Sequence, residues 1–105
     1  MYHCHIRFYL IGRQKEAFEI IKGMEPLEYF THEFTESDMP EAALTAKADV
    51  IMADLQDRNP EEILKALTST RKEGAEIILF AGKGQMECLA GCLGEVKDVW
   101  ILPMS

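Results

Sequence analysis

Short runs of apolar residues alternate along this 105-residue chain with segments in which apolar positions recur at helical spacing. Five of the runs are rich in β-branched and aromatic side chains, which favours β-strands. The runs at 50–55 and 76–81 are almost continuously apolar, as are strands that are covered on both faces of a parallel sheet. The predicted strands cover residues 6–11, 27–34, 50–55, 76–81 and 98–102.

The segments between these runs predict helices. In the first segment, Phe18, Ile21 and Met24 share one face at helical spacing. Two other segments, at 37–41 and 59–62, open with a capping side chain, a proline and acidic residues, which is the pattern of a helix N-terminus. The predicted helices cover residues 14–24, 37–47, 59–72 and 85–93.

The order of these elements predicts the class of fold. Strands that alternate with helices form a parallel sheet with right-handed crossovers and with helices on both faces. Residues 1–105 are therefore predicted to form a single α/β domain with a doubly wound, five-stranded parallel sheet. The pattern lacks a helix after the last strand, so we expect the last helix to be missing or truncated and the chain to be part of a longer protein.

Composition and charge narrow the classes of function. The net charge of −7, from 18 acidic and 11 basic residues, argues against nucleic-acid and anionic-membrane partners. No window approaches the roughly 20 apolar residues that span a bilayer, and the N-terminus has no secretory signal. Three cysteines, an odd number, fit free thiols in a reducing compartment. We therefore expect a cytoplasmic domain.

Ligands of open parallel sheets bind at the carboxyl ends of the strands, where Asp54 follows a buried run. The segment 48–55, with the sequence ADVIMADL, resembles the third strand and the phospho-accepting aspartate of bacterial response regulator receiver domains. Segments 77–82 and 98–103 resemble the fourth and fifth strands of that family. The resemblance implies a flavodoxin-like fold and places Asp54 at the phospho-acceptor position.

The other parts of the receiver site are replaced in this chain. Phosphoryl transfer to a carboxylate requires Mg²⁺ held by oxygen ligands, and receivers supply an acidic pair after the first strand. Here this position holds Gly12 and Arg13, the hydroxyl position after the fourth strand holds Ala81, and the lysine position of the fifth strand holds Leu102. The resemblance therefore implies a degenerate receiver, or pseudo-receiver, with Asp54 as a vestigial acceptor and with no catalytic residue, metal or cofactor.

A cation can replace the metal of such a site by pairing with the remaining carboxylate. Arg13 and Lys83 stand beside the ends of predicted strands and are candidates for an ion pair with Asp54. The structural alternative is an acid that caps a turn or pairs with a different neighbour. We expect Arg13→Ala to lower stability measurably if the ion pair forms.

Degenerate receivers of this kind stand at the N-terminus of multidomain bacterial signalling proteins, including those with PAS and diguanylate cyclase (GGDEF) domains. The resemblance implies a module that regulates an attached output domain by protein contacts or as a homodimer. Receivers commonly pair through the fourth helix and the fifth strand, and the corresponding residues, unless some belong to the core, are Met86, Leu89, Leu93 and Trp100.

Two other functions stay open at this point. One is an active receiver that is phosphorylated on Asp54, and the other is a small flavodoxin-like ligand-binding domain or enzyme. The domain itself is not expected to be an enzyme, and the resemblance leaves open that its parent protein is a diguanylate cyclase.

Histidine and cysteine residues offer two further candidate sites. His3, Cys4 and His5 are residue types that bind Zn²⁺, but on a strand Cys4 points away from the two histidines, so an exposed strand start is the favoured interpretation. Cys88 and Cys92 share one face of a predicted helix, where helix packing is favoured over a redox or metal role.

Overall fold

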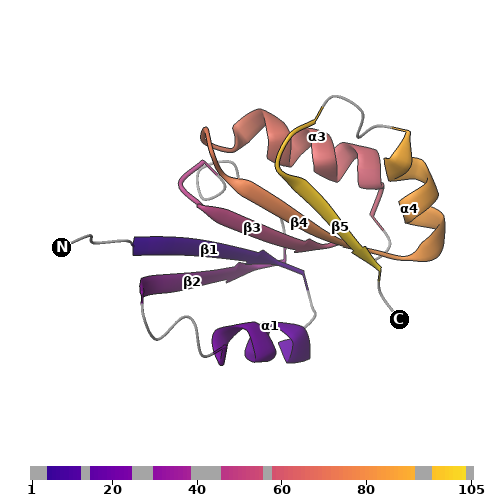
Figure 1. The fold of residues 1–105 in the computed structure, drawn as a ribbon. Helices are drawn as coiled ribbons and strands as arrows, with labels where there is room; N and C mark the ends of the chain where they lie inside the picture. Colours follow the sequence, from indigo (N-terminus) through magenta and orange to yellow (C-terminus); the bar gives the residue numbers. More distant parts are fainter. Residues whose placement is uncertain are drawn as a thin grey trace.

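The computed structural model describes residues 5–12, 15–24, 30–38, 46–55, 58–91 and 96–103. Within these ranges the chain forms five strands and three helices that alternate through most of the sequence (Figure 1). The elements are β1 (His5–Ile11), α1 (Lys15–Lys22), β2 (Thr31–Ser37), β3 (Val50–Asp54), α3 (Pro60–Thr70), β4 (Glu76–Ala81), α4 (Lys83–Ala90) and β5 (Val99–Pro103).

All five strands are parallel and lie in the order β2-β1-β3-β4-β5. This is the flavodoxin-like strand order, in which the chain reverses its direction of travel across the sheet between β1 and β3. Figure 1 shows α3 and α4 on one face of the sheet and α1 on the other. The predicted flavodoxin-like, doubly wound parallel sheet is therefore confirmed.

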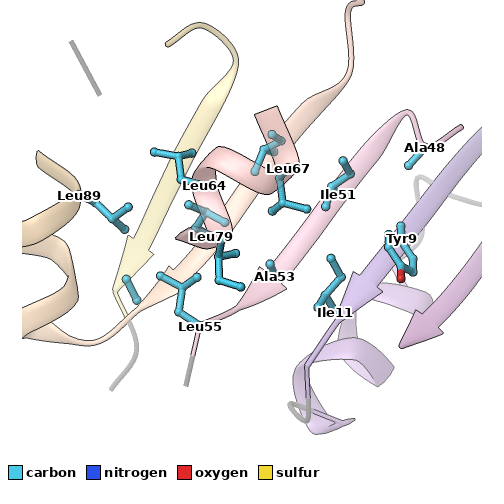
Figure 2. Close-up of a cluster of buried hydrophobic side chains, with 13 residues drawn as sticks. Tyr9, Ile11, Ala48, Ile51, Ala53, Leu55, Leu64, Leu67, Leu79 and Leu89 are labelled. Carbon is cyan, nitrogen blue, oxygen red and sulfur yellow. The ribbon is translucent and has the colours of Figure 1, made fainter. Parts of the chain in front are cut away.

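The face under α3 and α4 carries the larger part of the core. The apolar face of α3 presents Ile63, Leu64 and Leu67 to the central strands, and α4 contributes Leu89 (Figure 2). The strands β1, β3 and β4 contribute every second side chain to this face, because successive residues of a strand point to opposite faces. These strand residues are Tyr9, Ile11, Ile51, Ala53, Ile77, Leu79 and Ala81.

The opposite face has a smaller core beneath α1. Leu10, Phe18 and Met52 are buried there, and Ile21 packs against them from the helix. The rings of Phe8 on β1 and Phe34 on β2 stack with 4.9 Å between their centroids. The α1 helix thus covers the β1 side of this face.

Three predicted boundaries were wrong or incomplete. The second strand spans Thr31–Ser37 rather than 27–34, because an edge strand that is only half-buried needs few apolar residues. Ser37 ends β2 and Asp38 forms a bend, so the chain does not start a helix there; residues 39–45 of the helix predicted at 37–47 lie outside the described residues, and residues 46–47 form a turn. The α4 helix begins at Lys83, since Gly82 serves as its N-cap.

The start of α3 was predicted correctly. Asn59 is the N-cap, and its side-chain oxygen accepts hydrogen bonds from the backbone N–H groups of Glu61 at 2.9 Å and Glu62 at 3.3 Å. Pro60 occupies the first helical position, where its missing N–H costs no hydrogen bond. The two glutamates place negative charge at the positive end of the helix dipole.

Candidate functional site

Asp54 is the last residue of β3 and lies at the carboxyl edge of the sheet. It is 1% exposed, and among the residues whose burial the structure describes it is the one buried charged side chain. Its register partner on β4 is Phe80, so Asp54 shares the α1 face of the sheet with that ring. The carboxylate at the predicted phospho-acceptor position therefore does not face solvent.

Gly12 is the residue that lies against Asp54. It follows β1 and has a φ of 122°, a backbone conformation that residues other than glycine rarely adopt. Its N–H donates a hydrogen bond to the Ser37 carbonyl at 2.8 Å. A Cβ built on Gly12 would stand 2.7 Å from the Cβ of Asp54. The position that the resemblance matches to a receiver carboxylate therefore cannot take a side chain unless Asp54 or the backbone shifts.

The other two described positions of the predicted degenerate site, Ala81 and Leu102, lie on different faces of the sheet. Ala81 ends β4, is fully buried, and packs in the core beneath α3 and α4. Leu102 on β5 pairs with Phe80 in register and is 44% exposed on the α1 face. Neither side chain offers a polar atom, so neither can bind a phosphoryl oxygen beside Asp54.

Of the two cations predicted as partners of Asp54, the structure describes one. Arg13 lies outside the described residues. Lys83 is exposed at the first position of α4. The ion-pair hypothesis therefore stays a prediction.

A set of hydrogen bonds connects the turns that follow three strands. The Arg58 side chain, after β3, donates to the backbone carbonyl of Asp38, after β2. Gln85 at the start of α4 donates to the Arg58 carbonyl at 3.2 Å, and its side-chain oxygen accepts from the Gly82 N–H at 2.9 Å. These contacts hold the turns around the carboxyl edge in one arrangement.

Sequence reasoning missed Arg58 and Gln85. Gln85 carries a usable signal, since a glutamine at the third position of a helix caps the backbone at its start. The Arg58 contact spans 20 residues of sequence to a backbone carbonyl, and no local pattern marks such a contact.

Candidate metal ligands do not cluster in the described residues, because no three His, Cys, Asp or Glu side chains among them gather closely enough to hold a metal ion. Of the candidate metal ligands, His5 lies 3.8 Å from Glu33 and Cys88 donates to Glu61 at 3.2 Å. His3, Cys4 and Cys92 lie outside the described residues.

Charged groups at the amino edge of the sheet form a separate cluster. Asp49 accepts a hydrogen bond from the Arg7 N–H at 2.7 Å and pairs with the Lys72 ammonium. Burial favours the neutral acid, but the bonds from Lys72 and Arg7 outweigh it and hold the pKa of Asp49 below its ordinary value of 3.8. This cluster connects β1 with the turn between α3 and β4.

The predicted interaction residues do not share one surface. Leu89 is fully buried, and Met86 packs against the same core. Trp100 is 58% exposed and lies on the α1 face, because its neighbours Val99 and Ile101 pack on the other face. Leu93 lies outside the described residues.

An apolar groove runs along the α1 face beside Trp100. It has a volume of about 490 Å³ and lies between α1 and the exposed side of β5. Every residue that lines it is apolar: Phe8, Ile20, Ile21, Met24, Val50, Met52, Ile78, Phe80 and Leu102. Sequence reasoning missed this groove, although it placed Phe18, Ile21 and Met24 on one helical face.

Comparison with models of known protein families and with curated proteins finds no match to this chain. Within the part of the chain that the structure describes, no helix has the length and apolar character needed to cross a membrane.

Proposed function

We propose that this domain is a receiver-like signalling module that is not phosphorylated and that regulates an attached output domain through protein contacts or dimerisation. The domain itself acts in the cytoplasm and is not an enzyme. The attached output domain is one such as a diguanylate cyclase. These assignments rest on the resemblance of the segment around Asp54 to receiver domains, together with the flavodoxin-like strand order.

One observation carries the part of the proposal that concerns phosphate. Asp54 is 1% exposed, and a Cβ built on Gly12 would stand 2.7 Å from the Cβ of Asp54. A carboxylate must meet its phosphodonor in line, and charge on the transferring group must be offset by metal ions or cations. Ala81 and Leu102 supply neither charge nor a hydroxyl group.

An active receiver would need a different arrangement of the same edge. Asp54 would have to become accessible before a donor or a metal ion could reach its carboxylate, and the Gly12 backbone packs against this residue. Displacing Gly12 would break the hydrogen bond that its N–H donates to the Ser37 carbonyl. The closed arrangement is therefore expected to persist when a phosphodonor is present.

Incubation with acetyl phosphate and Mg²⁺, followed by intact-protein mass spectrometry, tests this proposal. A known active receiver treated in parallel provides the positive control, and Asp54→Asn provides the matched negative control. We expect no added phosphoryl group on the wild-type domain. A phosphoryl adduct on the wild type that is absent from Asp54→Asn would show an active receiver instead.

A further inference from the structure

The β2 strand forms one edge of the sheet, and β1 is its single neighbour among the described strands (Figure 1). The Ser37 carbonyl accepts a hydrogen bond from the Gly12 N–H at 2.8 Å, so the backbone groups of Ser37 face β1. Successive residues of a strand direct their backbone groups to opposite sides. The N–H and C=O groups of His32, Phe34 and Glu36 therefore point outward from the sheet, where a further strand can bind them.

The two edges of the sheet differ as acceptors of another strand. At the β5 edge, the Asp98 carbonyl accepts a hydrogen bond from the Ile77 N–H at 2.9 Å, which directs Asp98 toward β4. The alternate residues Val99, Ile101 and Pro103 face outward, and the missing N–H of proline blunts this edge. The β2 strand is seven residues long, and its sequence THEFTES has no proline or lysine to protect its edge.

The sequence of β2 is complementary to itself when a second copy runs in the opposite direction. A two-fold axis at Phe34 sets each outward-facing residue opposite another outward-facing residue, and every such pair exchanges two hydrogen bonds. Phe34 then lies opposite its own copy. The His32 imidazole lies opposite the Glu36 carboxylate of the second copy. Aromatic pairs and complementary polar pairs at directly opposite positions stabilise a sheet.

The neighbouring registers of the two strands are less favourable. An axis at Glu33 would set this carboxylate opposite its own copy, and like charges at opposite positions destabilise a strand pair. An axis at Thr35 would set Phe34 opposite Glu36. It would also carry His32 past the end of the opposite strand. The pattern of side chains therefore selects the axis at Phe34.

The acidic side chains of β2 do not prevent this pairing. Glu33 lies 3.0 Å from the guanidinium of Arg7, and Glu36 lies 3.1 Å from the ammonium of Lys22. Each carboxylate thus has a cation of its own chain beside it. The remaining charges behind the net value of −7 are screened at physiological salt when they lie more than about 8 Å away.

We propose that two copies of this chain associate through the outer edges of β2, as an antiparallel pair about a two-fold axis at Phe34. The contact is isologous, and it joins the two sheets into one continuous sheet. One pair of strands makes a small interface, so the dissociation constant is expected at about 10 μM to 1 mM. The β2 dimer goes beyond the proposed function, because it holds whether or not Asp54 accepts phosphate, and it uses none of the residues predicted on α4 and β5.

Amide hydrogen exchange, followed by NMR at about 10 μM and about 1 mM protein, tests the dimer. The N–H groups of His32, Phe34 and Glu36 should exchange several-fold more slowly at the higher concentration, because they become hydrogen-bonded in the dimer. The outward N–H groups of Val99 and Ile101 on the other edge are the matched controls, and their exchange should not change. Sedimentation velocity should show a monomer at the lower concentration and a dimer at the higher one.

Charge variants locate the contact and its register. His32→Glu sets two carboxylates opposite each other twice across the axis, and should raise the dissociation constant about tenfold. Ala66→Glu, on the exposed side of α3, makes the same change in net charge and should leave the dissociation constant unaltered. A mixture of His32→Glu with Glu36→Lys should associate more tightly than His32→Glu alone, because the new carboxylate faces the new ammonium. Far-ultraviolet circular dichroism verifies the fold; if Glu36→Lys does not fold, the other two variants decide.

Several outcomes would overturn the β2 dimer. A monomer at about 1 mM, or unchanged exchange at His32, Phe34 and Glu36, would remove the contact. Slower exchange at the two control amides would move the contact to the β5 edge. Equal weakening by His32→Glu and Ala66→Glu would reduce the effect to general repulsion, and a mixture that associates no more tightly would refute the axis at Phe34. None of these results bears on phosphorylation, so failure here is distinct from failure of the proposed function.

Discussion

Replacing Gly12 by alanine tests the contact that closes the Asp54 site. Alanine at this position must adopt a φ of 122°, and its Cβ would stand 2.7 Å from the Cβ of Asp54. Asp54 is 1% exposed at the end of a central strand, so it has little room to move away. The substitution therefore combines backbone strain with overpacking.

The expected loss in the free energy of unfolding follows from these two terms. A disfavoured backbone conformation costs about 1–3 kcal/mol, and overpacking of a filled site costs a further ~1–3 kcal/mol. Alanine restricts the unfolded chain and returns about 0.4–1 kcal/mol. The net loss is about 1–5.5 kcal/mol, a large share of the ~5–15 kcal/mol typical of a domain.

Two other glycines supply matched controls for the separate terms. Gly74 has a φ of 84° but no atom within 4 Å of a built Cβ, so Gly74→Ala carries only the backbone strain and should cost about 1 kcal/mol. Gly84 lies within α4 without a positive φ and with open space around it. Gly84→Ala should stabilise the domain by up to ~1 kcal/mol.

Urea unfolding of the three variants, followed by far-ultraviolet circular dichroism and Trp100 fluorescence, gives the comparison. The difference between Gly12→Ala and Gly74→Ala measures the contact with Asp54. A loss for Gly12→Ala that is no larger than the loss for Gly74→Ala would refute the reasoning, since Gly12 would then not be packed against Asp54.

Two further predictions concern the N-cap of α3 and the charged cluster at the amino edge of the sheet. Asn59→Ala removes both N-cap hydrogen bonds of α3 and should lower the free energy of unfolding by about 1 kcal/mol in urea titration, whereas an unchanged value would refute the cap. The pKa of Asp49 is lower in the folded state, so its stabilising effect is present above pH 3.8 and is lost as the pH falls below that value. Asp49→Asn should therefore lower the free energy of unfolding at neutral pH by about 1 kcal/mol. In acid-unfolding curves, the decline of stability below about pH 4 should be flatter for the variant than for the wild type. An equally steep decline in both would contradict this assignment.

The sheet was predictable because its central strands have distinctive sequences. The runs that became β3 and β4 are almost continuously apolar, and both lie between two other strands. The edge strand β2 was misplaced because Thr31–Ser37 contains one aromatic residue among polar ones, and its half-buried position requires no more. The apolar pattern thus locates buried strands better than edge strands.

The candidate site was predictable only in part. Its position followed from the rule that ligands of parallel sheets bind at the carboxyl ends of the strands, and from the place of Asp54 at the end of an apolar run. The burial of Asp54 depends on how closely Gly12 approaches it, and that approach is set by the register of β1 with β3. Register between strands some 40 residues apart leaves no local trace in the sequence, beyond a glycine after β1.

The interaction surface shows a similar limit. Alternation along β5 separates Trp100 from Val99 and Ile101, but the sequence does not tell which of the two sets faces the helices. The structure assigns Val99 and Ile101 to the core of α3 and α4, and leaves Trp100 on the open face with Leu102. Met86 and Leu89 therefore cannot form one surface with Trp100.

The most direct test of the closed Asp54 site is a titration of the domain with Mg²⁺ and beryllofluoride, a stable mimic of an aspartyl phosphate. A ligand at 100 times its dissociation constant stabilises a folded domain by about 2.7 kcal/mol, which would raise the Tm of a domain of this size by roughly 10 °C or more. We predict no change in the Tm or the amide NMR spectrum of either the wild type or Asp54→Asn. A rise in Tm in the wild type that disappears in Asp54→Asn would contradict the account, because Asp54 would then be an accessible, metal-dependent acceptor.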